Sequence, residues 1–148
     1  MVKGKPGFVG RALYDVQTGR FERSLAGLAA AGALITTAEI FSEHDSASFG
    51  NKMMWWPIVV MPTLAPAGVA AVFSHRAAKT VLPLASLLVI ANGAQGTFLH
   101  LRGIARKPGG FSNFRYNWEM GPPAFAPGLA ALVGGMGLLA SLLRREGE

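Results

Sequence analysis

The sequence predicts an all-α integral membrane protein, a four-helix bundle in which four transmembrane helices make one domain over residues 1–148. Hydrophobic residues make up 51% of the chain and charged residues only 15%, which does not fit an ordinary soluble domain. The apolar residues form blocks, each near the about 20 residues that a helix needs to cross a hydrocarbon core of about 30 Å. The expected transmembrane helices cover residues 24–43, 53–74, 80–101 and 122–143.

The net charge of +6 comes largely from basic residues that flank these blocks. Basic flanks are typical of membrane helices, so the charge favours contact with lipid headgroups, and we expect no nucleic-acid partner. The N-terminal segment, the turn at 75–80 and the C-terminus together carry nine Lys and Arg, against five in the other two loops. By the positive-inside rule both termini are expected in the cytoplasm, with the protein in a bacterial inner membrane.

Residues 1–23 and the second expected helix carry further expectations. Residues 1–23 mix Phe8, Leu13 and Tyr14 with charges, which suits a segment lying on the cytoplasmic membrane surface; a partly ordered tail is the other interpretation. The second expected helix contains three prolines, which predict a kinked helix packed against its neighbours: Pro57, Pro62 and Pro66.

Polar residues form a narrow stripe on the first expected helix and a broader one on the third. At about 100° per residue, the stripes place side chains of each helix on one face. Because both helices end on the same side of the membrane and can face the bundle centre, the stripes are expected to converge. The candidate intramembrane site is Glu39, Glu43, His44, Asn92, Gln95 and His100.

Glu39 is the most informative of these residues, since a charge in hydrocarbon costs at least about 2.5–3.5 kcal/mol. It is expected to face the interior, be protonated, or pair with Arg102, His100 or a cation. A structural ion pair and a functional carboxylate both remain open for Glu39. For Glu43 and His44, which lie near the predicted helix end, an ordinary position in the membrane interface is the alternative.

The sequence requires no cofactor, although two kinds remain possible. A bis-histidine haem would need His44 and His100 to face each other across helices. A quinone would need an apolar slot with a polar end, which the two stripes could form. We expect no metal-ion site, because the Glu-x-x-His pairs of di-iron bundles are missing and the chain has no cysteine.

The loop over residues 102–121 is expected outside the cytoplasm and is rich in basic and aromatic residues. Such residues are favoured at the centres of protein interfaces, so the loop is predicted to contact lipid headgroups or a partner subunit. Two tryptophans at the start of the second helix are expected in an interfacial aromatic belt. The candidate docking residues are Trp55, Trp56, Arg106, Phe111, Phe114, Tyr116 and Trp118.

No complete catalytic constellation is visible, which favours a protein that is not an enzyme. The leading functional hypothesis is an accessory or scaffolding subunit of a larger membrane complex, such as an electron-transfer or photosynthetic assembly, surrounded by lipids and other membrane subunits. The alternative is a membrane protein with its own quinone-, ion- or proton-handling site at Glu39 and His100. A scaffold should tie Glu39 to protein donors and leave no pocket, whereas an active site should show a cavity against both stripes.

Overall fold

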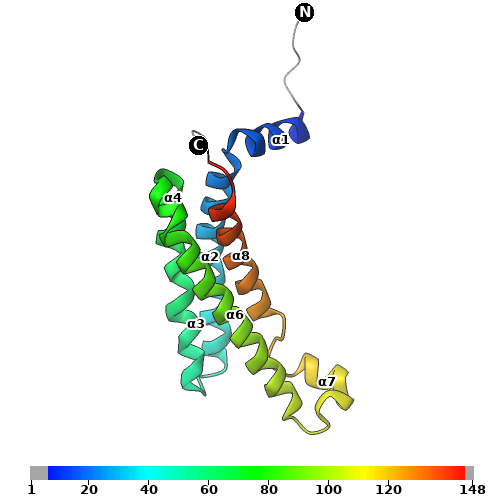
Figure 1. Ribbon diagram of the computed structural model, residues 1–148. Helices are drawn as coiled ribbons and strands as arrows, with labels where there is room; N and C mark the ends of the chain where they lie inside the picture. Colours follow the sequence, from blue (N-terminus) through cyan, green and yellow to red (C-terminus); the bar gives the residue numbers. More distant parts are fainter. Residues whose placement is uncertain (1–6, 146–148) are drawn as a thin grey trace, which may run out of the picture.

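The computed structural model describes residues 7–145, which form helices joined by short turns (Figure 1). Among these residues there is no strand. The α-helices are α1 (Phe8–Thr18), α2 (Phe21–Ser46), α3 (Trp55–Val60), α4 (Leu64–Phe73), α5 (His75–Lys79), α6 (Val81–Ala105), α7 (Phe114–Glu119) and α8 (Ala126–Leu142). The 3-10 helices are η1 (Lys52–Met54), η2 (Met61–Thr63) and η3 (Gly110–Asn113).

Three helical segments are long and apolar enough to cross a membrane, Phe21–Ser46, Lys52–Phe73 and His75–Ala105. This agrees with an all-helical, membrane-embedded chain. Large apolar side chains remain exposed along these segments and α8, as lipid contact requires: Leu28, Leu34, Val59, Leu84, Leu87, Phe98, Leu132 and Leu139. The fourth apolar helix, α8, begins at Ala126 instead of residue 122 and has 17 residues, so it is shorter than expected.

The prolines of the second predicted helix divide it into α3, η2 and α4. Pro62 lies at the start of η2, whose three residues interrupt the α-helical pattern between Val60 and Leu64. Proline lacks the N–H that an interior helical position donates, which explains the local change of hydrogen bonding. Residues 55–73 therefore form one helical segment whose middle turn, η2, is a 3-10 helix.

Small residues bring the helices together at close range. A Cβ atom on Gly68 of α4 would lie 2.7 Å from the carbonyl oxygen of Ala26 and 2.9 Å from Cβ of Ala30, both on α2. A Cβ atom on Gly134 of α8 would lie 2.9 Å from Cγ1 of Ile90 on α6. Such contacts suit helices in a membrane, where close van der Waals packing drives association.

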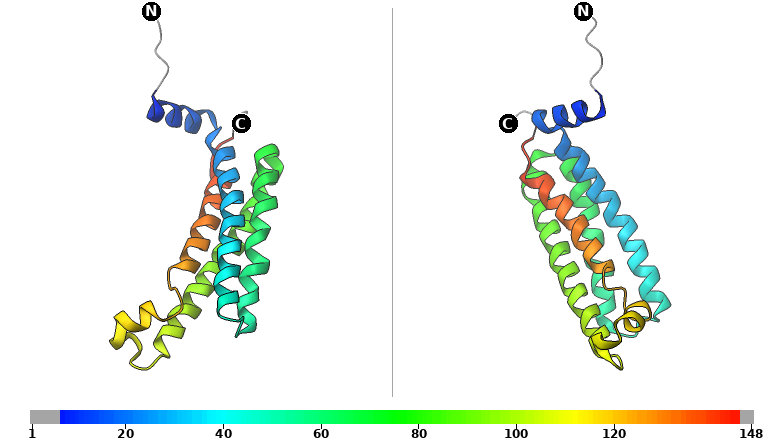
Figure 2. Two further views of the ribbon diagram at one scale, coloured as in Figure 1. Left: turned by 180° about the vertical axis from the view of Figure 1, so that it is seen from behind. Right: turned by 90° about the vertical axis from the view of Figure 1, so that its right-hand side faces the viewer.

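Both ends of the described chain lie at one end of the bundle, which we call the terminal end (Figure 1). There α1 extends sideways from the bundle, and none of its residues is buried (Figure 2). Phe8, Val9 and Leu13 of α1 are exposed, so their apolar side chains are available to a membrane surface. The opposite end, with η1 and α7, is called the loop end.

Candidate functional site

At the loop end the bundle contains an open cavity of about 1100 Å³ between α2 and η1 on one side and α6 and the start of α8 on the other. Every residue of the predicted polar site lines it: Glu39, Glu43, His44, Asn92, Gln95 and His100. The two polar stripes therefore converge on one space.

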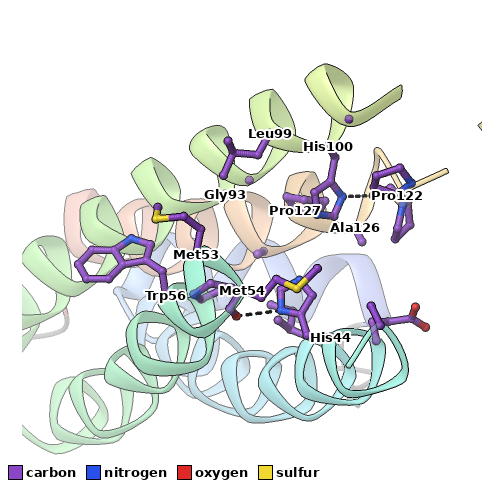
Figure 3. A pocket seen from close by; sticks show the side chains of 18 of the residues that line it. His44, Met53, Met54, Trp56, Gly93, Leu99, His100, Pro122, Ala126 and Pro127 are labelled. Carbon is purple, nitrogen blue, oxygen red and sulfur yellow. Dashed lines mark hydrogen bonds between the residues drawn. The ribbon is translucent and has the colours of Figure 1, made fainter. Parts of the chain in front are cut away.

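The wall from α2 and η1 presents an oriented imidazole (Figure 3). Nδ1 of His44 lies 2.9 Å from the carbonyl oxygen of Met54. Because a carbonyl oxygen only accepts hydrogen bonds, Nδ1 carries the proton, and in the neutral ring Nε2 keeps its lone pair. Met54 is held in η1, whose N-cap Asn51 accepts a hydrogen bond from the Met53 N–H at 2.9 Å.

The wall from α6 repeats this arrangement. Nδ1 of His100 lies 2.8 Å from the carbonyl oxygen of Pro123, in the segment that leads into α8. The same argument places the proton on Nδ1 and the lone pair on Nε2. Figure 3 shows His44 and His100 on opposite walls of the cavity. The two rings are near enough for a charge on one to act on the other.

Several polar groups on the cavity walls lack protein partners. Asn92 is only 6% exposed, yet within the described residues its side chain makes no hydrogen bond. Such a group is normally satisfied by water or a ligand. Glu39 lines the cavity and forms no ion pair with described residues, so a pair with Arg102 or His100, one of the alternatives expected for it, is not present. Gln95 and Glu43 are also exposed.

The rest of the lining is mostly apolar, with a basic rim. Hydrophobic side chains come from several elements: Ile35, Ile40, Met53, Trp56, Leu99 and Leu129. Arg102 in the last turn of α6 and Arg106 at its C-cap line the same cavity and make no ion pair within residues 7–145. No group of three or more His, Cys, Asp or Glu in the described chain is arranged to hold a metal ion.

The predicted docking residues do not form one surface, because they lie in three different parts of the structure. Trp56 and Arg106 line the cavity. Trp55, at the start of α3, stacks on Phe49 in the turn after α2, with ring centroids 4.2 Å apart. The remaining four belong to the loop that follows α6: Phe111, Phe114, Tyr116 and Trp118.

That loop, expected over 102–121, starts later because α6 continues to Ala105, and it folds into an ordered unit containing η3 and α7. Its centre is Asn117, which is 1% exposed and donates to the carbonyl oxygens of Pro108 and Gly110 at 3.0 and 2.7 Å. A Cβ atom on Gly121 would collide with the Asn117 carbonyl oxygen. Trp118 packs between two rings, 4.8 Å from Phe114 and 5.0 Å from Phe125.

Neither the backbone groups that orient the histidines nor the residue that orders the loop was predicted from the sequence. The carbonyl groups of Met54 and Pro123 leave no sequence signal, because any residue supplies a carbonyl. Asn117 is one of two amides among the aromatic residues of this loop, with Asn113, and the sequence does not distinguish which of them is buried. Arg102, already named as a partner for Glu39, lies instead with Arg106 on the cavity rim.

No protein-family model, curated protein or solved structure matches this chain.

Proposed function

We propose that the protein is a membrane-embedded binding protein that holds a small, mostly apolar ligand or cofactor in the cavity at the loop end. The observation that carries this proposal is the meeting of both polar stripes in one cavity of about 1100 Å³. Ligand sites are typically concave, mostly apolar and equipped with a few convergent polar groups. This cavity combines apolar walls with Glu39, Asn92 and two oriented imidazoles.

The state of Glu39 favours a ligand site over a scaffold. A carboxylate at membrane depth costs at least about 2.5–3.5 kcal/mol unless something compensates it. Glu39 has no such compensation from described residues and lines an open space. A bound molecule or its associated water would supply the missing partner.

The topology that we propose is four crossings with both termini in the cytoplasm of a bacterium. At about 1.5 Å per residue, the 17 residues of α8 extend about 25 Å, and the segment from Pro122 to Phe125 adds further length. Both ends of the described residues lie at the terminal end, which supports an even number of crossings (Figure 1). The larger number of basic residues at that end favours its placement in the cytoplasm.

A role as a subunit of a larger membrane complex is the second candidate, and the loop unit favours it. Phe111 and Tyr116 are 52% and 58% exposed on a unit that is itself ordered around Asn117. Exposed aromatic side chains on a rigid support are typical of interface centres. A ligand site and a partner surface are compatible in one small subunit.

The ligand proposal is tested by filling the cavity. Thr36 is half-buried on α2 and lines the cavity, so Thr36→Phe places a ring in the ligand's space. Leu34→Phe on the same helix enlarges an exposed side chain that does not line the cavity and is the matched control. Small molecules are extracted from each purified protein and counted per chain by mass spectrometry.

The wild type and Leu34→Phe should carry the same small molecule at about one per chain, and Thr36→Phe should lose most of it. Equal retention by Thr36→Phe would place any bound molecule elsewhere. A wild type with no small molecule beyond bulk phospholipid would remove the proposal.

A further inference from the structure

The two cavity histidines are oriented in the same way, each by a hydrogen bond to a backbone carbonyl oxygen. Each Nδ1 is hydrogen-bonded to a backbone carbonyl oxygen, at 2.9 Å for His44 and 2.8 Å for His100. Metal-binding histidines usually donate their other ring N–H to a carbonyl or carboxylate, which fixes the tautomer and the ring orientation. Neither Nε2 has a protein partner in the described part of the chain. Both are therefore available as metal ligands.

The shortage of further protein ligands limits the kind of metal centre. A bare zinc, iron or manganese ion needs about four to six donors, mostly from protein. No group of three suitable side chains is present between residues 7 and 145. A haem iron takes its equatorial donors from the porphyrin and needs from the protein only axial ligands, so two opposed imidazoles are sufficient.

The cavity also provides for the other parts of a haem. Its apolar lining, with Trp56 and Leu99, suits the porphyrin faces, and its volume of about 1100 Å³ gives room for a large ring. Haem carries two propionate groups, and carboxylates are bound strongly by guanidinium groups. Arg102 and Arg106 lie at the loop end of α6, without an ion pair among described residues, where such groups would emerge.

Charge and hydrogen bonding distinguish haem from the quinone considered above. An oxidised quinone offers carbonyl oxygens, which accept hydrogen bonds, whereas both Nε2 atoms present lone pairs. The ferric centre of a bis-imidazole haem carries net positive charge, which the carboxylate of Glu39 on the cavity wall would offset.

We propose that the cavity binds haem, with Nε2 of His44 and Nε2 of His100 as the axial ligands of the iron and with Arg102 and Arg106 on the propionates. This inference rests on the proposed function, because it names the ligand of the same cavity. It assigns one axial ligand to α2 and one to α6, so the bound haem would join these two helices.

The test uses the full chain, expressed with a haem precursor and purified in mild detergent. Absorption spectra are recorded before and after reduction, and haem is quantified chemically. The expected result is about one haem per chain with the spectrum of a low-spin, six-coordinate iron. His44→Ala and His100→Ala should each lower haem content at least about 10-fold. His75→Ala, at the terminal end and outside the cavity, is the matched control and should keep full content.

Two further measurements distinguish the loss of an axial ligand from misfolding of a variant. Added imidazole should restore a six-coordinate spectrum to haem-loaded His100→Ala, because the free base fills the vacated axial position. Arg102→Gln with Arg106→Gln should weaken haem binding while leaving the low-spin spectrum unchanged.

Three results would overturn the inference. A wild type that takes up no haem, even when hemin is titrated, but carries another small molecule would remove haem and leave the ligand site standing. Full haem content in His44→Ala and His100→Ala would remove the axial assignment. A wild type without any ligand would remove the proposed function as well.

Discussion

Nε of Arg145 lies 3.3 Å from Oε1 of Glu22, so the last described residue is joined to the first turn of α2. Both side chains are buried. The same guanidinium donates to the carbonyl oxygens of Ala71 and Val72 at 2.7 and 2.9 Å, near the C-terminus of α4. These are carbonyl groups that the end of a helix leaves without intrahelical partners. One arginine therefore holds together three segments at the terminal end.

Replacing Arg145 by Met should destabilise the protein by about 3–5 kcal/mol, because it leaves the Glu22 carboxylate buried without the buried cation that lies 3.3 Å from it. Arg23, with Nε 3.6 Å from Oε1 of Glu22 and partly exposed, can compensate only in part. The measurement is denaturant unfolding in detergent. Arg144→Met, at an exposed neighbour, is the control and should cost much less. Equal stability of the two variants would show that the ion pair between Arg145 and Glu22 does not stabilise the terminal end of the bundle.

Gly134 and Gly135 are neighbours on α8 that should respond differently to alanine. A Cβ atom on Gly134 would lie 3.0 Å from the carbonyl oxygen of Ser86, and one on Gly135 meets nothing within 4 Å. Gly134→Ala should therefore cost about 1–3 kcal/mol through overpacking, and Gly135→Ala should change stability by less than about 1 kcal/mol. Thermal unfolding of both variants checks the prediction. The reverse order would place α8 in a different rotation against α6.

The topology can be measured with single cysteines, since the natural chain contains none. Ser112→Cys in η3 and Gln17→Cys in α1 introduce thiols at exposed positions at opposite ends of the bundle. A membrane-impermeant maleimide should label Ser112→Cys in intact spheroplasts and Gln17→Cys only after lysis. Labelling of both before lysis would contradict four crossings with cytoplasmic termini.

The loop unit should contribute to partner binding through its exposed rings. Phe111→Ala combined with Tyr116→Ala should reduce recovery of a co-purifying membrane subunit several-fold, without altering the fold around Asn117. Phe73→Ala, which removes an exposed ring near the terminal end, is the matched control. Recovery is compared by quantitative mass spectrometry after gentle extraction. Unchanged recovery in the double variant would assign the loop to lipid contact instead.

The parts of the fold that follow from local pattern were predictable from the sequence. The length of the apolar blocks indicated membrane helices, and helical periodicity placed Glu39 and His100 on faces that line one cavity. The proline-rich second block predicted a kinked helix, and in the structure η2 interrupts its α-helical pattern. These inferences needed only the composition and spacing of residues within one segment.

Other features depend on contacts between distant segments. Glu22 reads as a charge near a helix end, and only the packed bundle brings Arg145 to it. The histidine tautomers depend on carbonyl groups of Met54 and Pro123, which any sequence would supply. The late start of α8 follows the course of the segment through Pro122 and Pro123, which approaches α6 at Gly103 before the helix begins.

The most direct measurement is native mass spectrometry of the wild-type protein released from mild detergent. The mass of the folded protein is compared with that of the same chain after denaturation. A ligand in the cavity predicts that the folded protein is heavier by the mass of one small molecule, which denaturation releases. A folded protein with the mass of the bare chain would show that the cavity between His44 and His100 holds no resident ligand.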